Sequence, residues 1–144
     1  MATAFYELRY RAQFFDTDAM GVVHHSNYVR IMEMARVAWL REMGVMQLHI
    51  PHGPMVLGVT NLRVEYRRPV RFDDEMHVRV QGRLEGTVFR TQYAIWSPRL
   101  SEYAALGWVD LVLMKADSLQ PTRFPLEMRA ELRELPWSDR WPEL

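Results

Sequence analysis

The chain has 144 residues, of which 49% are apolar and 25% charged. This length and composition predict one soluble globular domain that spans residues 1–144. Its eighteen basic and eighteen acidic side chains cancel, so no net field favours nucleic acid as a partner, and no apolar run approaches the roughly 20 residues that span a membrane. The absence of Cys excludes disulfide bonds and a thiolate nucleophile, and it favours a reducing, cytoplasmic compartment.

The first predicted element is a strand that leads into an acidic turn. Residues 5–14 are rich in aromatic side chains and largely alternate apolar with polar residues, which is typical of a strand. Asp16 and Asp18 follow, and Gly21 provides backbone freedom that a larger residue lacks. We assign Asp16 to the structure of the turn.

A long helix is predicted after this turn, over about residues 26–43. Ser26 and Asn27 suit its start, because their side chains can accept hydrogen bonds from free backbone N–H groups. An ionised carboxylate, unpaired amide donors and a partial positive charge would then lie close together. Glu33 is expected to pair with a neighbouring arginine such as Arg36, which is placed at the edge of the buried face. That buried face is expected to carry Tyr28, Ile31, Met32, Ala35, Ala38, Trp39 and Met43.

The rest of the chain predicts a sheet and a proline-rich tail. Residues 45–54 are expected to form a loop. In the tail, about residues 120–144, Pro125 is expected to open a short helix. One helix covers only one face of a sheet, so an oligomer is expected to bury the other face. Apolar patterning predicts four long strands, over 55–66, 75–86, 88–97 and 103–115.

Three motifs in this order resemble a known family. D-T-D-A-M-G-V-V-H-H-S-N-Y at residues 16–28, followed by the helix, resembles the signature of the hotdog-fold acyl-CoA thioesterases. The branch is the one that contains 4-hydroxybenzoyl-CoA thioesterase and the Tol-Pal-associated thioesterase. The passages E-Y-R-R-P-V-R-F-D-D-E (65–75) and Q-P-T-R-F-P (120–125) are similar to later parts of the same family.

The resemblance implies an α+β hotdog fold, in which a five-stranded antiparallel sheet wraps around one long helix. It implies a homodimer that joins two sheets edge to edge, and a tetramer that is a dimer of dimers, with active sites at subunit interfaces. The implied reaction is hydrolysis of an acyl-CoA thioester to the free acid and CoA. Coenzyme A is then part of the substrate, and no cofactor is expected.

The resemblance also assigns catalytic roles. Asp18 matches the catalytic carboxylate, and His25 matches the residue whose backbone N–H binds the thioester carbonyl oxygen at the helix N-terminus. Asn27 is a candidate for orienting a water or the carboxylate, and capping the helix explains it equally well. Asp18 can act as a nucleophile that forms a mixed anhydride or as a general base for water, and both routes stay open.

Other residues are candidates for binding the substrate. Met20, Val22 and His24 are placed near the acyl pocket, although a surface or packing role suits His24 equally well. Arg90 and Thr91 resemble in position a family segment near the coenzyme. No metal site is expected, because the sequence has no Cys and no H-E-x-x-H motif. Further candidates for the coenzyme phosphates, for which a solvated strand face is the alternative, are Arg63, Arg67, Arg68 and Arg71.

Several alternatives remain open at this level. The acyl group is aromatic or fatty, and the carrier is CoA or acyl carrier protein. A non-catalytic acyl-CoA-binding protein on the same fold is a further alternative, which the intact acidic motif disfavours. A hotdog dehydratase or hydratase is disfavoured because the pattern lacks the His and carboxylate pairing that such chemistry needs.

Overall fold

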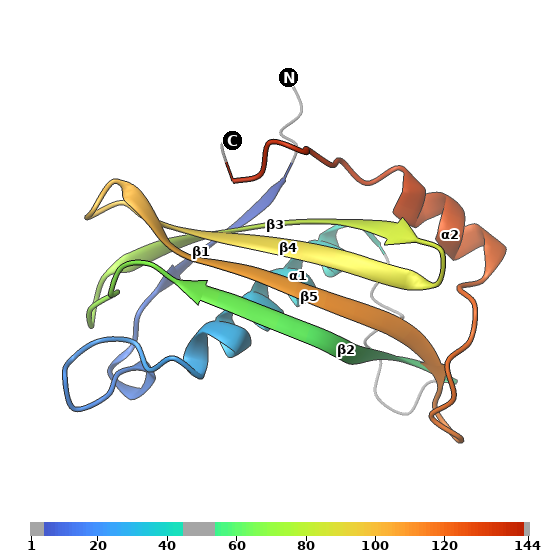
Figure 1. The fold of residues 1–144 in the computed structure, drawn as a ribbon, viewed down its shortest axis with the longest axis horizontal. Helices are drawn as coiled ribbons and strands as arrows, with labels where there is room; N and C mark the ends of the chain where they lie inside the picture. Colours follow the sequence, from blue (N-terminus) through green and yellow to red (C-terminus); the bar gives the residue numbers. More distant parts are fainter. Residues whose placement is uncertain (1–4, 45–53, 143–144) are drawn as a thin grey trace.

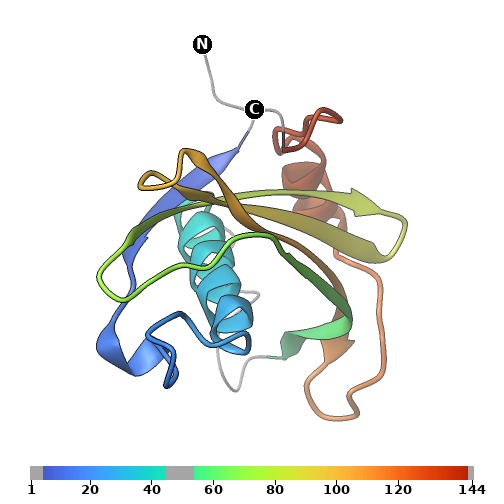
Figure 2. The same cartoon turned by 60° about the vertical axis from the view of Figure 1, so that its left-hand side comes forward.

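The computed structural model describes residues 5–44 and 54–142. Within these ranges, five antiparallel strands form one sheet in the order β1-β3-β4-β5-β2, and the helix α1 lies against one face of it (Figure 1). The sheet curves around α1 (Figure 2), so the predicted architecture is confirmed. No helix in the described ranges is long and apolar enough to cross a membrane. The main elements are β1 (Tyr6–Arg11), α1 (Asn27–Glu42), β2 (Met55–Tyr66), β3 (Glu75–Glu85), β4 (Val88–Ser97), β5 (Glu102–Lys115) and α2 (Leu126–Arg133).

The four later strands agree with the prediction to within one residue at each end. In β3, Met76, Val78 and Val80 are buried while His77 and Arg79 between them are only partly buried, because successive side chains of a strand point to opposite faces. The connection from β3 to β4 is two residues long, since Glu85 already pairs with Val88.

The first strand is shorter than predicted. β1 ends at Arg11, and a short 3-10 helix, η1 (Phe14–Asp16), follows after two residues. The Asp16 carboxylate accepts a hydrogen bond from the Gln13 N–H at 2.8 Å, which favours the tight turn over a continued strand. Phe14, expected at the end of the strand, is therefore on the surface with 77% of its area exposed.

The buried face of α1 differs from the prediction at Ala38, Arg36 and Met43, and it also includes Leu40. Ala38 is only partly buried. Met43 is exposed because α1 ends at Glu42, one residue before it. Arg36 is buried because its Nη1 donates a 3.0 Å hydrogen bond to the Tyr93 hydroxyl, while its Nη2 lies 3.6 Å from the Glu33 carboxylate. The pairing expected for Glu33 is thus confirmed. The buried residues of α1 are Tyr28, Ile31, Met32, Ala35, Arg36, Trp39 and Leu40.

The C-terminal segment packs along the sheet. α2 follows Pro125 and buries Leu132 in the core. Beyond α2, the Ser138 backbone and the Gln81 side chain exchange two hydrogen bonds of 2.9 Å, which attach the tail to β3. The loop expected at residues 45–54 lies, except for Pro54, outside the described residues.

Candidate active site

The acidic turn between η1 and α1 is a narrow hairpin. The Asp18 N–H donates to the Val22 carbonyl at 2.9 Å, and the Gly21 N–H donates to the Asp18 carbonyl at 2.9 Å. Gly21 has φ +75°, a left-handed conformation that glycine adopts without steric cost. The hydrogen bonds of this turn fix the position of the Asp18 backbone and so the direction of its side chain.

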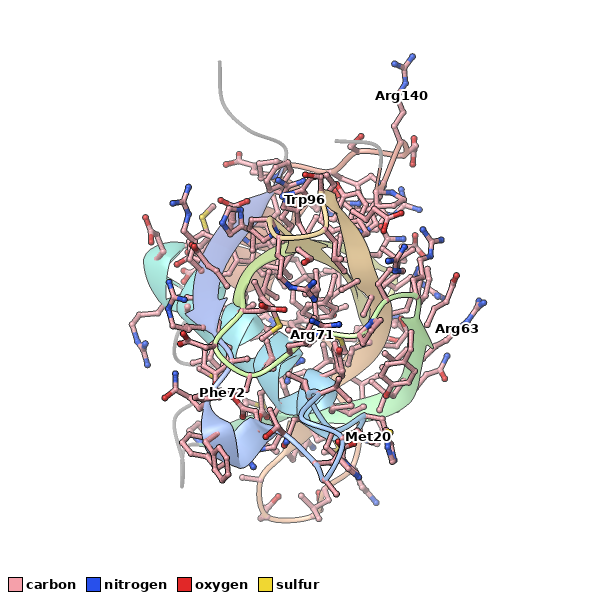
Figure 3. All side chains as sticks on the ribbon, turned by 90° about the vertical axis from the view of Figure 1, so that its left-hand side faces the viewer. Met20, Arg63, Arg71, Phe72, Trp96 and Arg140 are labelled. Carbon is pink, nitrogen blue, oxygen red and sulfur yellow. The ribbon has the colours of Figure 1, made fainter. Side chains whose placement is uncertain are left out.

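The hairpin is attached to the connection between β2 and β3. The Val23 N–H donates to the Val70 carbonyl at 2.8 Å, and the Phe72 N–H donates to the Gly21 carbonyl at 3.1 Å. Met20 and Phe72, at the ends of these two loops, are both exposed at the same end of the molecule (Figure 3). Backbone hydrogen bonds to a second loop therefore limit the movement of the turn that carries Asp18.

Asp16 has a structural role, as predicted. Its buried carboxylate accepts hydrogen bonds from the Tyr10 hydroxyl at 2.6 Å and from the Gln13 N–H at 2.8 Å. Burial, together with this bond to Asp16, raises the pKa of Tyr10 to about 12, so its hydroxyl keeps its proton at neutral pH. The Asp16 backbone carbonyl also accepts from the His24 N–H at 2.8 Å. Asp16 thus joins β1 to the start of α1.

Asp18 has a different environment from Asp16. Its Oδ1 accepts a 2.8 Å hydrogen bond from the Met20 N–H, which orients the carboxylate. Within the described residues, Oδ2 accepts no hydrogen bond. The side chain is half-buried and lines a cavity, so one carboxylate oxygen has lone pairs free for a ligand.

A backbone N–H just before α1 is also free. Among the described residues, the His25 N–H donates no hydrogen bond, although both of its neighbours do. The His24 N–H donates to the Asp16 carbonyl at 2.8 Å, and the Ser26 N–H donates to His24 Nδ1 at 3.2 Å. An unpaired amide beside a helix N-terminus is suited to binding a negative charge.

Asp18 and His25 line the same cleft, which has a volume of about 350 Å³. Two tyrosines support it: the rings of Tyr28 and Tyr66 meet edge to face at 5.2 Å, and the Tyr66 hydroxyl donates to the His25 carbonyl at 2.8 Å. Burial raises the pKa of Tyr28 to about 12 and also raises the pKa of Tyr66. The lining consists of Asp18, Met20, Val22, Val23, His25, Tyr28, Tyr66, Arg67, Arg68 and Pro69.

Comparison with known proteins identifies the family. Residues 12–132, which make up most of the chain, match the model of the thioesterase-like superfamily. The chain belongs to this superfamily. Over 75 residues, 51% of its length, the chain is 39% identical to a relative from Aquifex aeolicus (strain VF5), of which this stretch covers 59%.

Two further relatives match over most of their length. The acyl-CoA thioester hydrolase YbgC of Escherichia coli (strain CFT073) is 28% identical over 138 residues, 93% of this chain and all of YbgC. The DHNA-CoA thioesterase of Staphylococcus aureus has the same fold, with a TM-score of 0.77 at 24% identity over 83% of this chain and 80% of its own. The resemblance of residues 16–28 to the hotdog-fold acyl-CoA thioesterases is thus confirmed, and so is the hotdog fold.

The structure of this superfamily member brings only some of the predicted site residues together. Met20 and Val22 line the cleft with Asp18 and His25, as expected, but His24 does not. The His24 Nδ1 instead bonds the Ser26 hydroxyl at 2.8 Å.

Arg90 and Thr91 lie at a different cavity of about 390 Å³, which Trp108 and Trp137 also line. The Thr91 hydroxyl is buried and donates to the Val109 carbonyl at 2.8 Å. Arg90 is 3.5 Å from the Asp110 carboxylate. Within one protomer, neither residue reaches the Asp18 cleft.

The Asn27 side chain contacts the acidic turn next to the cleft. Its Nδ2 donates a 2.8 Å hydrogen bond to the Asp16 carbonyl, 11 residues earlier in the chain, and so connects α1 to the acidic turn. Ser26 occupies the N-cap position, where its side chain makes no capping bond within the described residues. The Asn27 side chain therefore contacts the acidic turn through the Asp16 backbone.

The sequence offered no sign that Tyr66 belongs to the site. The residue stands in the quoted passage 65–75, but the contact with His25 spans 41 residues and depends on how β2 passes α1. The described residues contain no group of three or more His, Asp or Glu side chains placed to bind a metal ion. His49 and His52, which are spaced as H-x-x-H in the sequence, lie outside the described residues.

Proposed function

We propose that this protein hydrolyses acyl-CoA thioesters to a free acid and CoA, with Asp18 as the essential carboxylate. The observation that carries the proposal is that one cleft is lined by two residues with an unpaired group among the described residues: Asp18, through its Oδ2, and His25, through its N–H. Thioester hydrolysis needs a group that attacks or activates water, and a donor for the charge that develops on the carbonyl oxygen. Asp18 and His25, which both line the cleft, would supply these two groups.

The His25 N–H serves as the donor for the developing oxyanion. A donor that is already oriented and unpaired needs no rearrangement when the charge forms, and loss of one such donor typically costs about 10²–10³ in kcat. Tyr66 and Asn27 position this donor, since they bind the carbonyl of His25 and the turn next to it.

Asp18 acts in one of two ways, and the proposal includes both. As a nucleophile, its free oxygen attacks the acyl carbon, the C–S bond breaks, CoA leaves as a thiolate that takes up a proton, and water then opens the mixed anhydride. As a general base, it takes a proton from the water that attacks the same carbon. In each case the products are the acid and the CoA thiol.

We further propose that CoA, rather than acyl carrier protein, is the carrier. The names of the relatives support CoA: YbgC is named an acyl-CoA thioester hydrolase, and the Staphylococcus aureus protein is named for a CoA ester. The tyrosine rings and Met20 of the cleft suit either an aromatic or a fatty acyl group.

A homodimer is part of the proposal. β2 is an edge strand of the sheet, and exposed apolar side chains on it, Val59 and Leu62, suit a second copy joined edge to edge. Tyr66 and the residues that follow it line the cleft, so a second copy along β2 would border the active site. We also expect two such dimers to form a tetramer, and we place the enzyme in the cytoplasm, since a cysteine-free chain suits a reducing compartment.

The test is a panel of aromatic and fatty acyl-CoAs, with the released thiol detected, on the wild type, Asp18→Asn and Asp117→Asn. Asp117 lies beyond β5 and gives a control with the same change of charge. We expect Asp18→Asn to lower kcat by about 10³-fold or more, and Asp117→Asn to leave it unchanged. Near-wild-type turnover by Asp18→Asn would refute the proposal, and tight binding without turnover by the wild type would favour a binding protein. The same acyl group on acyl carrier protein tests the carrier.

A further inference from the structure

Three arginines of the C-terminal segment line one cavity beside the turn between β3 and β4. Arg123 precedes α2, while Arg129 and Arg133 are one helical turn apart on it, and the cavity between them and the β-turn has a volume of about 190 Å³. α2 lies at the opposite end of the sheet from the blue segment that carries Asp18 (Figure 1). The remaining lining residues are Leu84, Gly86, Thr87 and Phe124.

The positive charges of this cavity are not balanced by acidic groups. Among the described residues, none of the three arginine side chains forms an ion pair or a hydrogen bond, and the Arg129 Nε is buried without a partner. A buried donor left without a partner is costly, and like charges four residues apart on a helix repel each other. Two acidic residues lie on α2, Glu127 and Glu131, and neither comes within ion-pair distance of these arginines.

Most arginines outside this cavity have a side-chain partner, including most of the candidates for the coenzyme phosphates, whereas Arg71 and Arg140 have none among the described residues. Arg67 pairs with Glu65 at 3.0 Å, and Arg68 pairs with Glu102 at 2.7 Å. The Arg63 guanidinium lies over the Trp108 ring. The α2 cavity differs from the rest of the described surface in that three arginines without partners line one cavity.

We propose that the cavity formed by Arg123, Arg129 and Arg133 binds a phosphate-bearing anion. Guanidinium groups present pairs of N–H donors that match phosphate oxygens, and three of them together suit a ligand with more than one negative charge. A phosphate monoester or a diphosphate has that charge at neutral pH, whereas a single carboxylate does not. The Thr87 hydroxyl, on the turn, is a further donor in the lining.

The direct test is titration of inorganic pyrophosphate into the protein, followed by calorimetry at low ionic strength. Wild type, Arg129→Gln, Arg133→Gln and Arg140→Gln are compared, because the Arg140 side chain extends from the body of the protein (Figure 3) and gives a control of equal charge. We expect saturable binding in the wild type and in Arg140→Gln, and binding at least tenfold weaker in the other two.

Two outcomes would overturn the proposal. One is no saturable binding by the wild type, and the other is equal weakening in Arg140→Gln, which would indicate a response to net charge. Arg129→Lys adds a second comparison, because it keeps the positive charge and loses the paired N–H donors of the guanidinium group. We expect its affinity for pyrophosphate to be lower than that of the wild type and higher than that of Arg129→Gln. If Arg129→Gln fails to fold, the exposed Arg133 carries the test.

Kinetics then distinguish two sources of the phosphate group, and this step rests on the proposed function. If the ligand is the nucleotide of the substrate, Arg133→Gln raises KM for an acyl-CoA at least tenfold and leaves the same acyl-pantetheine, which lacks the nucleotide, unaffected. If a separate phosphorylated molecule is the ligand, both KM values stay unchanged while pyrophosphate binding is lost. Failure of the hydrolase proposal would leave the titration result intact.

Discussion

The Tyr66 hydroxyl donates a 2.8 Å hydrogen bond to the carbonyl oxygen of His25. This bond joins the end of β2 to His25, two residues before α1, and it holds the carbonyl of the residue whose N–H is unpaired among the described residues. The edge-to-face contact between the Tyr66 and Tyr28 rings orients the hydroxyl further. Tyr66 is thus a positioning residue for the candidate oxyanion donor, and its effect can be separated from that of Asp18.

We expect Tyr66→Phe to lower kcat about tenfold and to change KM little, because the ring stays in the cleft while the His25 segment loses one restraint. The free energy of unfolding should fall by only about 1 kcal/mol, since water can replace the bond at an exposed site. Steady-state kinetics and urea unfolding check this. Tyr6→Phe, on β1, is the control, and a change in KM without a change in kcat would contradict the positioning role.

The two carboxylates of the acidic turn should separate stability from activity. Asp16→Asn weakens the buried bonds to Tyr10 and to the Gln13 N–H, so we expect the free energy of unfolding to fall by about 1–3 kcal/mol. Asp18→Asn should cost less than about 1 kcal/mol and abolish turnover. Urea unfolding and the thiol-release assay on the two variants provide the measurements. If Asp18→Asn lost more free energy of unfolding than Asp16→Asn, the structural role of Asp16 and the catalytic role of Asp18 would be wrongly assigned.

Tyr28 predicts a pH dependence of stability. Its pKa is raised to about 12 by burial, against about 10 in the unfolded chain, so the native state binds the proton more tightly. Its contribution to stability is therefore fully present below pH 10 and is lost as the pH rises through 12, by roughly 2 kcal/mol at pH 12. We expect urea unfolding of Tyr28→Phe to show a smaller fall between pH 10 and 12 than wild type. Identical slopes would contradict this.

The edge of β2 predicts the assembly state. Leu62→Lys places a charge on the exposed edge strand, so we expect it to convert the proposed dimer to a monomer and to lower activity. Leu126→Lys is the matched control, because Leu126 is even more exposed but lies at the start of α2. Light scattering after size-exclusion chromatography gives the mass of each variant. A Leu62→Lys protein with the mass of the wild type would exclude this edge as the interface.

The sequence by itself determined the long helix and the four later strands, because their patterns are local, whereas it placed the end of the first strand too late. Apolar patterning predicted the four later strands to within one residue, and the acidic motif of residues 16–28 indicated both the family and the cleft residues Asp18 and His25. Hydrogen bonds of a turn to its nearest neighbours also follow from local sequence, as Asp16 illustrates.

Only the tertiary structure decided which distant groups meet. The burial of Arg36 depends on the Tyr93 hydroxyl of β4, and the contact of Tyr66 with His25 depends on how β2 crosses the helix start. The separation of Arg90 from the cleft, and the grouping of Arg129 with the β3–β4 turn, follow from sheet order and helix packing. The spacing of apolar residues along the chain predicts whether a side chain faces the core or the solvent. The residue that this side chain contacts depends on where segments many residues away lie in the fold.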